Sequence, residues 1–119
     1  MMRPFRLFIT VTVLAVIAAG CAPSAQAENP PWIDELISKF QNEPVANPPE
    51  SLWRYDYYGQ TVFYIPPQCC DQYSQLLDAS GKVICAPEGG FTGRGDGRCP
   101  DFFDKRTNEK LIWQDSRGR

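Results

Sequence analysis

The amino-acid sequence predicts an α+β domain, in which one N-terminal helix packs on a small antiparallel sheet of two hairpins that disulfides staple. Three observations support this fold class. One stretch of apolar residues has helical spacing, later stretches are short and rich in aromatic and β-branched residues, and four cysteines lie in the second half of the 119-residue chain. We expect one small domain at residues 30–114 and a polar, frayed tail at residues 115–119.

Residues 1–20 resemble a bacterial lipoprotein export signal. Two early arginines precede an apolar run, which is shorter than the about 20 residues that cross a bilayer and has the length of a signal-peptide core. Small residues at 18–20 then precede Cys21, as in the lipobox of those proteins. The resemblance implies cleavage before Cys21, attachment of a diacylglycerol to its thiol and acylation of its new amine. Residues 21–29 are expected to form a tether.

The same resemblance predicts a location. Ala22 follows Cys21, where an aspartate would resemble the inner-membrane retention mark, so we expect an outer-membrane anchor with the domain facing the periplasm. The membrane is then a partner through lipid on Cys21. Ordinary secretion is the alternative, because residues 25–27 also have the small-x-small pattern of a cleavage site. Cleavage there would leave a soluble periplasmic protein that begins at Glu28.

The helix is predicted from apolar side chains between residues 32 and 40, which recur at intervals of three and four and form one face. Asn29 is a suitable N-cap, Pro30 and Pro31 suit the first turn, and Pro44 ends the helix. The residues of the apolar face are Trp32, Ile33, Leu36, Ile37 and Phe40.

Residues 52–57 and 61–65 are predicted to be the strands of a first hairpin, with Tyr58-Gly59 as its turn. In the first strand the tryptophan and the tyrosines alternate with other residues, so they share one side of the sheet. The second strand stops at a pair of prolines.

The remaining elements are shorter. Residues 73–78 and 82–85 predict a second hairpin around a turn of small residues. Residues 86–100 hold five glycines and predict a loop. A short turn at residues 101–106 and a final strand at residues 110–114 complete the domain.

Cysteine usage predicts two disulfides. Cys69, Cys70, Cys85 and Cys99 make an even number in a small exported chain, for which hydrophobic burial alone is marginal. A bond between the adjacent pair would force a strained ring, so we expect each of the two to bond elsewhere. Two connectivities remain, Cys69–Cys85 with Cys70–Cys99 and Cys69–Cys99 with Cys70–Cys85.

Composition argues against several functions. The first twenty residues hold two arginines and no acids, so residues 21–119 carry 10 basic and 14 acidic side chains, a net charge of −4. Such a charge does not favour a nucleic-acid partner. The chain has no histidine, the commonest general base and zinc ligand, so we expect no enzymatic activity, no catalytic residue, no metal and no cofactor.

The best candidate for a binding site is the segment 91–98, whose ends would be tied by the cysteines on either side. Its glycines permit backbone conformations that are closed to other residues, and its arginines can bind carboxylates. We expect an envelope protein or a glycan as the partner. A loop whose glycines only turn the chain is the alternative. The residues expected to form the contact are Arg94, Asp96 and Arg98.

A second functional hypothesis is an inhibitor of a secreted protease. The loop between Cys85 and Cys99 would then insert Arg94 or Arg98 into a trypsin-like pocket. The triplet at residues 94–96 also matches an adhesion motif, which is short enough to occur by chance.

Other constellations are weaker. Asp71, Asp96, Asp101 and Asp104 could gather around calcium, but their spacing fits no EF-hand and surface carboxylates are favoured. The adjacent cysteines lack the two intervening residues of thioredoxin-like pairs, and export to an oxidising space opposes a four-thiolate zinc site. A platform of aromatic side chains could stack sugars or peptides, although core packing explains most of them. These aromatics are Trp53, Tyr55, Tyr57, Tyr58, Phe63 and Tyr64.

Four short motifs begin at residues 69, 85, 93 and 99, and read CCDQ, CAP-x-GG, GRGDG and CPDF. Together they resemble an uncharacterised family of small bacterial lipoproteins, over roughly residues 32–113. The resemblance implies export and disulfides, and it implies no reaction. The sequence therefore predicts a lipid-anchored lipoprotein of the cell envelope that acts as a binding or structural module.

Overall fold

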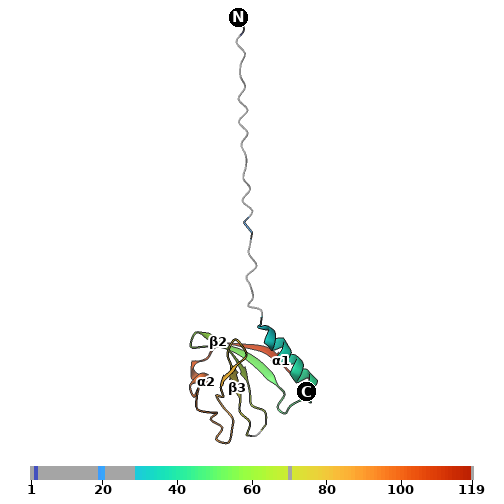
Figure 1. Ribbon diagram of the computed structural model, residues 1–119, viewed down its shortest axis with the longest axis vertical. Coiled ribbons are helices and arrows are strands. Elements are labelled where there is room, and N and C mark those ends of the chain that lie inside the picture. Colours follow the sequence, from blue (N-terminus) through green and yellow to red (C-terminus); the bar gives the residue numbers. More distant parts are fainter. Residues whose placement is uncertain (1, 3–18, 21–28, 70, 119) are drawn as a thin grey trace.

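The computed structural model describes residue 2 and residues 19–20, 29–69 and 71–118. One long helix, a four-residue helix and five strands make up this part of the chain (Figure 1). In chain order they are α1 (Pro31–Asn42), β1 (Ser51–Tyr57), β2 (Gln60–Ile65), β3 (Gln75–Leu77), β4 (Val83–Cys85), α2 (Phe102–Lys105) and β5 (Thr107–Gln114).

The strands form one antiparallel sheet in the order β4-β3-β2-β1-β5, so the fold is α+β as predicted. Two details of the prediction are wrong. The sheet is not two hairpins, because β2 also pairs with β3 and β5 pairs with β1. This continuous pairing satisfies backbone groups that two separate hairpins would leave open at their edges. The helix is not at the N-terminus of the chain, since it begins at Pro31.

The N-cap of helix α1 lies one residue later than predicted. Pro30, not Asn29, occupies the N-cap position, and its carbonyl accepts a hydrogen bond from the Ile33 amide at 2.9 Å. Pro31 suits the first helical position because its fixed φ is helical and its missing N–H would have no partner there. The helix ends before Glu43, whose backbone is extended. Its predicted extent is otherwise close to what the structure shows.

The helix-covered face of the sheet is purely apolar at its centre. Phe63 meets the indole of Trp32 edge-on, with ring centroids 5.2 Å apart. The Trp32 indole N–H also donates to the carbonyl of Ala79 at 2.9 Å, which joins the start of α1 to the turn between β3 and β4. The buried residues of this face are Ile33, Leu52, Phe63, Ile65 and Leu77.

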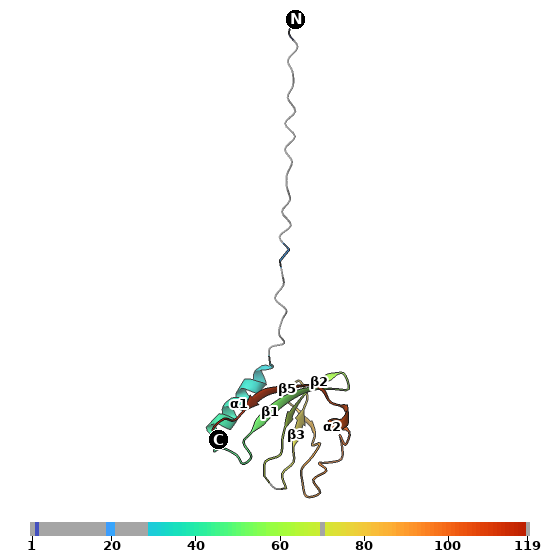
Figure 2. The ribbon, with the colours of Figure 1, turned by 180° about the vertical axis from the view of Figure 1, so that it is seen from behind.

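The loop-covered face lies on the other side of the sheet, under α2 and the long loop that precedes it. Figure 2, from behind, again shows α1 and α2 on opposite sides of the molecule. Phe102 is fully buried there, and its ring centroid lies 5.5 Å from those of Tyr55, Tyr57 and Tyr64. Trp53 also packs on this face, so the first strand has the sidedness that its alternation predicts.

After β5, the side chains of Asp115 and Arg117 are held by hydrogen bonds. Asp115 is 3% exposed and binds the Arg117 side chain, with an Nη2–Oδ2 distance of 2.7 Å. The Arg117 guanidinium also donates to the carbonyls of Phe40, Gln41 and Glu43 at 2.9–3.2 Å. The last carbonyls of a helix lack intrahelical partners and attract cations, so Arg117 caps α1 from the far end of the chain.

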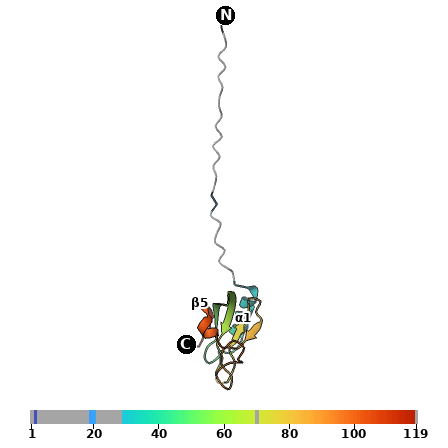
Figure 3. The ribbon, with the colours of Figure 1, turned by 90° about the vertical axis from the view of Figure 1, so that its left-hand side faces the viewer.

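The two ends of the sheet differ. At one end, the β3–β4 turn packs on the start of α1, where a Cβ on Gly81 would lie 2.8 Å from the Trp32 ring. At the other end, the loops that follow β2 and β4 project together, at residues 66–74 and 86–101. Figure 3 shows this separation edge-on, with the long loops at the bottom and the start of α1 above.

Candidate binding surface

The Gly-rich segment, residues 86–98, has a defined shape because its own backbone is hydrogen-bonded. The Asp96 amide donates to the Ala86 carbonyl at 2.9 Å, and the Gly95 amide donates to the Gly89 carbonyl at 3.0 Å. The Gly90 amide donates to the Gln72 carbonyl at 3.1 Å and ties the segment to its neighbour. Internal bonds of this kind fix a loop that would otherwise sample many conformations.

Two of its glycines are required by close packing. At Gly95, φ is +68° and a Cβ would lie 1.9 Å from the Ala86 carbonyl oxygen. At Gly89, φ is +86° and a Cβ would lie 2.1 Å from the Gln72 carbonyl oxygen. At both positions the neighbouring backbone is too close to leave room for a side chain. Both glycines are therefore required for the conformation of the segment.

A disulfide between Cys85 and Cys99 closes this segment, with a Cα–Cα distance of 6.1 Å. Both predicted connectivities are therefore wrong, because each paired these two cysteines with the earlier ones. The end of β4 brings Cys85 under the loop-covered face, where Cys99 is also buried. Cys69 is disulfide-bonded as well. Cys70, expected in a disulfide, and Cys21, expected to carry lipid, lie outside the described residues.

Two of the three predicted contact residues are engaged with each other. The Arg98 Nε donates to the Asp96 carboxylate at 2.8 Å, and its backbone amide donates to the same group at 3.0 Å. These bonds, the backbone one first, hold the pKa of Asp96 below its usual value. Arg98 and Asp96 therefore shape the loop and have less capacity for a partner.

The third predicted contact residue, Arg94, differs from these two in its side-chain contacts. Its backbone amide donates to Thr92 Oγ1 at 3.3 Å, and its guanidinium meets no carboxylate in the part of the chain that the structure describes. Phe91, on the turn just before it, is 94% exposed. An exposed aromatic ring gains importance when other exposed binding residues lie beside it, because contiguous patches are the ones that mark interaction sites.

Tyr73 extends the exposed surface from the neighbouring loop. It is 55% exposed, and its ring lies so close to Gly90 that a Cβ there would be 2.4 Å away. We call Tyr73, Phe91 and Arg94 the loop patch. Aromatic and arginine side chains on a rigid backbone are the residues that dominate binding energy in protein interfaces. Tyr73 and Phe91 were not among the predicted contact residues.

The predicted aromatic platform is divided between two faces. Phe63 is buried under α1, whereas Tyr55, Tyr57 and Tyr64 lie under the loop. Their hydroxyls are also occupied. Tyr57 donates to Asp101 at 2.6 Å, Tyr55 donates to Glu109 at 2.6 Å, and Tyr64 donates to Glu88.

Two of these tyrosine–carboxylate bonds, those of Tyr57 to Asp101 and Tyr64 to Glu88, attach the long loop to the sheet. Burial first, and the hydrogen bond to Asp101 second, raise the pKa of Tyr57 to about 12. Tyr58 is 67% exposed but donates to the same Asp101 carboxylate. Both bonds lower the pKa of Asp101. Of the acids considered for calcium, Asp96 and Asp101 thus have other partners. No metal-binding group of three or more acids or cysteines occurs among the described residues.

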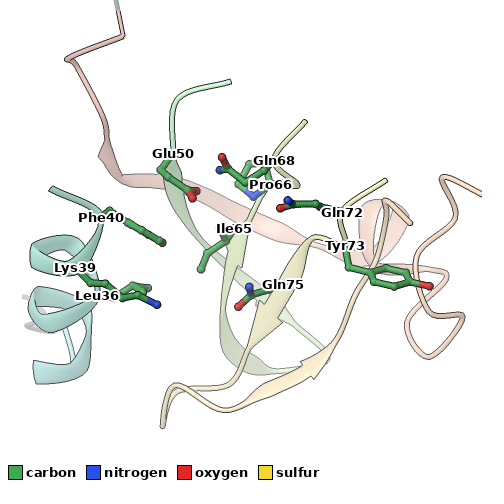
Figure 4. A pocket seen from close by; sticks show the side chains of 10 residues that line it. All are labelled: Leu36, Lys39, Phe40, Glu50, Ile65, Pro66, Gln68, Gln72, Tyr73 and Gln75. Carbon is green, nitrogen blue, oxygen red and sulfur yellow. The ribbon is translucent and has the colours of Figure 1, made fainter. Parts of the chain in front are cut away.

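The structure also contains a pocket that the sequence did not indicate. It has a volume of about 120 Å³ and lies between α1 and the loop after β2 (Figure 4). Leu36, Phe40, Ile65 and Pro66 form its apolar wall. Its polar lining consists of Lys39, Glu50, Gln68, Gln72, Tyr73 and Gln75.

Glu50 is the unusual member of this lining. Its Oε2 is buried, and the described residues provide no hydrogen-bond donor to it. Burial raises the pKa of Glu50, partly offset by a hydrogen bond from Gln68. No sequence signal reveals this site, because Glu50 follows a proline-rich connector and its neighbours are ordinary residues of separate elements.

None of the helices that the structure describes is long and apolar enough to cross a membrane. The predicted export signal, apart from residues 2 and 19–20, lies outside the described part.

The profile of a family described as "Domain of unknown function (DUF6970)" matches residues 38–115, more than half of the chain. The matched region runs from within α1 to the residue after β5, and so includes the Gly-rich segment and all of the pocket lining except Leu36. No curated protein and no solved structure matches the chain.

Proposed function

This chain belongs to the DUF6970 family, a domain of unknown function, and from its geometry we propose that it is a binding module of the cell envelope, anchored through lipid on Cys21. The main support for this proposal is the loop patch. It combines a 94% exposed phenylalanine with an arginine that is not paired within the described chain, on a backbone fixed by hydrogen bonds and a disulfide. Binding then requires little ordering of the loop, which favours affinity.

The position of the loop patch supports the same proposal. The start of α1, where a tether of residues 21–29 would join the domain, packs on the β3–β4 turn at one end of the sheet. The Gly-rich segment projects from the other end (Figures 1 and 3). A domain anchored through its N-terminus would therefore present the loop patch away from the membrane, toward a partner protein or glycan.

A site-specific cross-linking experiment in cells tests the binding role. A photoreactive amino acid at position 91 is expected to give a discrete cross-linked species that disappears when Arg94→Ala is added. The matched control is position 111 on β5, where Leu111 is 43% exposed, combined with Lys110→Ala. Equal yields at positions 91 and 111, or no product at position 91, would favour a purely structural role.

The anchor has its own test. The intact mass of the mature protein, extracted from membranes, is expected to equal that of the chain from Cys21 with its acyl groups. A mass that begins at Glu28 would instead indicate a soluble periplasmic protein and remove the membrane as a partner.

Protease inhibition is the second candidate function. The observation that favours it is an exposed arginine, Arg94, on a segment closed by a disulfide. Its neighbours Gly93 and Gly95 have φ angles of +74° and +68°, which bend a backbone that a protease cleft binds in extended form. We therefore rank this role second. Micromolar protein that leaves trypsin-like proteases fully active would exclude it.

A further inference from the structure

The Glu50 pocket is a second site, separate in chemistry from the loop patch. Glu50 lies directly before β1, and its carboxylate points into the space between α1 and the loop after β2 (Figure 4). Gln68 lies beside Glu50, and Gln72 and Gln75 line the part of this space that is further from it. A carboxylate and three amides provide several acceptors around one small volume.

Not all of these acceptor atoms have a hydrogen-bond donor. The buried Glu50 Oε2 meets no donor in the described chain, and such an oxygen loses its interaction with water without replacement. Native proteins seldom leave a buried polar atom in this state unless water or a ligand completes it. The pocket offers the room, since about 120 Å³ is several times the roughly 10–15 Å³ that one water needs by the same measure.

The charges around Glu50 favour a cation. Glu43 and Asp115 are acids close enough to raise the pKa of Glu50, whereas the cation of Lys39 lowers it. The Lys39 ammonium lies 4.0 Å from a Glu43 oxygen, with its side chain 67% exposed, so it neutralises Glu43 at the surface. Lys39 also lines the pocket, but it forms no ion pair with Glu50 among the described residues, so an ionised Glu50 keeps an open acceptor for a second cation.

We propose that the Glu50 pocket binds a primary alkylammonium group, with Glu50 Oε2 accepting one N–H and the glutamine amide oxygens accepting the others. An ammonium group has three donors and no acceptor, which suits a site whose open atom is an acceptor. Its aliphatic stem would lie along Leu36, Phe40 and Ile65, which form the apolar wall. An anion would meet the Glu50 charge, and a neutral alcohol would leave that charge unpaired.

Binding of n-butylammonium to the full mature chain tests this assignment. In ¹⁵N-resolved NMR spectra at neutral pH, the side-chain amide signals of Gln68, Gln72 and Gln75 are expected to shift with saturation. The uncharged analogue n-butanol is expected to bind at least about tenfold more weakly, because it lacks the charge. Equal affinity for the two compounds, or no shift at tens of millimolar amine, would overturn the proposal.

Two substitutions test whether the Glu50 carboxylate is the group that binds the ammonium. Glu50→Gln keeps the size of the side chain and removes its charge, and is expected to weaken n-butylammonium binding at least about tenfold. Glu43→Gln is the matched control, because it removes an acid outside the pocket lining, and should change affinity by less than about threefold. A Glu50→Gln protein with native-like spectra elsewhere and unchanged affinity would show that the carboxylate is not the receptor.

Lys39 is the intramolecular competitor. Lys39→Met removes an ammonium at the rim and is expected to leave n-butylammonium affinity unchanged or higher. Weaker binding in this variant would contradict the assigned charge preference.

Two sources offer the same chemistry, and a second probe separates them. If Nα-acetyl-lysine amide binds more tightly than n-butylammonium, the pocket recognises a lysine side chain of a peptide or protein. If the free amine binds more tightly, the pocket recognises a small amine. Because these measurements use the Glu50 pocket alone, they are independent of cross-linking at position 91.

Discussion

The two faces of the sheet are buried to a similar degree but are held together in different ways. On the helix-covered face, Ile33, Leu52 and Phe63 are at most 1% exposed and contact other apolar side chains. On the loop-covered face, Phe102 is equally buried, but the tyrosines around it end in hydroxyls that bind carboxylates. The first face stabilises the fold by burying apolar side chains. The second face does this too, and its hydrogen bonds also fix the position of a loop.

This difference has a physical basis. Apolar contacts are roughly proportional to buried area and have little directionality, so they hold a helix that already has its own backbone hydrogen bonds. A loop has no regular series of backbone hydrogen bonds, so it needs individual, directional hydrogen bonds at defined points. Tyr57 to Asp101 and Tyr64 to Glu88 are such bonds, and Arg106 adds a cation over the Tyr55 ring at 4.8 Å. The loop patch proposed for binding belongs to the loop region that these directed bonds hold.

The largest predicted effect is on the helix-covered face. Phe63→Ala is expected to lower the free energy of unfolding by about 3–5 kcal/mol, because it leaves a cavity beside Trp32. Phe103→Ala is the control, since that ring is 38% exposed at the edge of the loop-covered face. Urea denaturation with disulfides intact measures both. A larger loss for Phe103→Ala would mean that the loop-covered face supplies most of the stability.

The next effect concerns the disulfide of the loop-covered face. Replacing Cys85 and Cys99 together by alanine is expected to cost about 3 kcal/mol, the loop-closure entropy of some 15 residues. The indole N–H resonance of Trp32 should be unchanged below the transition, because its surroundings are on the helix-covered face. Loss of that signal in the native baseline would show that the two faces do not fold independently of this bond.

The third prediction compares two glycines of the same segment. Gly93→Ala is expected to cost about 1–2 kcal/mol, because φ is +74° but a Cβ would meet no atom within 4 Å. Gly95→Ala carries the same strain and also a clash with the Ala86 carbonyl, for about 1–3 kcal/mol more. Hydrogen exchange of the Asp96 amide is expected to rise only in Gly95→Ala. Equal effects would mean that the close approach at Gly95 can relax.

The comparison of faces also explains what the sequence could predict. Helix α1 and the hairpin of β1 and β2 depend on local periodicity and on the Tyr58-Gly59 turn, so their extents are close to those predicted. The pairing of β2 with β3 depends on the path of residues 66–74, which has no periodic signal. The sheet was therefore predicted as separate hairpins.

The same distinction applies to the candidate site. The glycines and arginines of residues 89–98 mark the segment, but the bond between Cys85 and Cys99 depends on where β4 ends. The pairing of Arg98 with Asp96, and the packing of Tyr73 on Gly90, are side-chain geometry that residue types do not specify. The Glu50 pocket combines residues of α1, the connector and the loop after β2, so it exists only in the fold.

At alkaline pH the loop-covered face is expected to weaken first. Burial and an acceptor carboxylate raise the pKa values of Tyr55 and Tyr57 from 10.0 to about 12. The folded state therefore retains protons that the unfolded state loses, so stability is full below pH 10 and falls as pH rises toward 12. Tyr57→Phe should reduce this fall, as measured by urea midpoints across the range. A wild-type midpoint that stays constant would contradict directed tyrosine bonds.

The smallest predicted effect is at Glu50, beside the helix-covered face. Its pKa is raised above 4.5, chiefly by burial, so the folded protein binds a proton more tightly than the unfolded chain does. Its contribution to stability is greatest below pH 4.5 and declines as pH rises through the folded pKa. Glu50→Gln should remove this decline in urea midpoints. Glu43→Gln should only reduce it, because Glu43 is one of the acids that raise the Glu50 pKa. Saturating n-butylammonium is expected to oppose the decline in the wild type and in Glu43→Gln but to have no such effect in Glu50→Gln, since it binds the ionised Glu50. A decline of equal size in the Glu50→Gln protein would assign the effect to other acids and remove the evidence for an unpaired charge in the pocket.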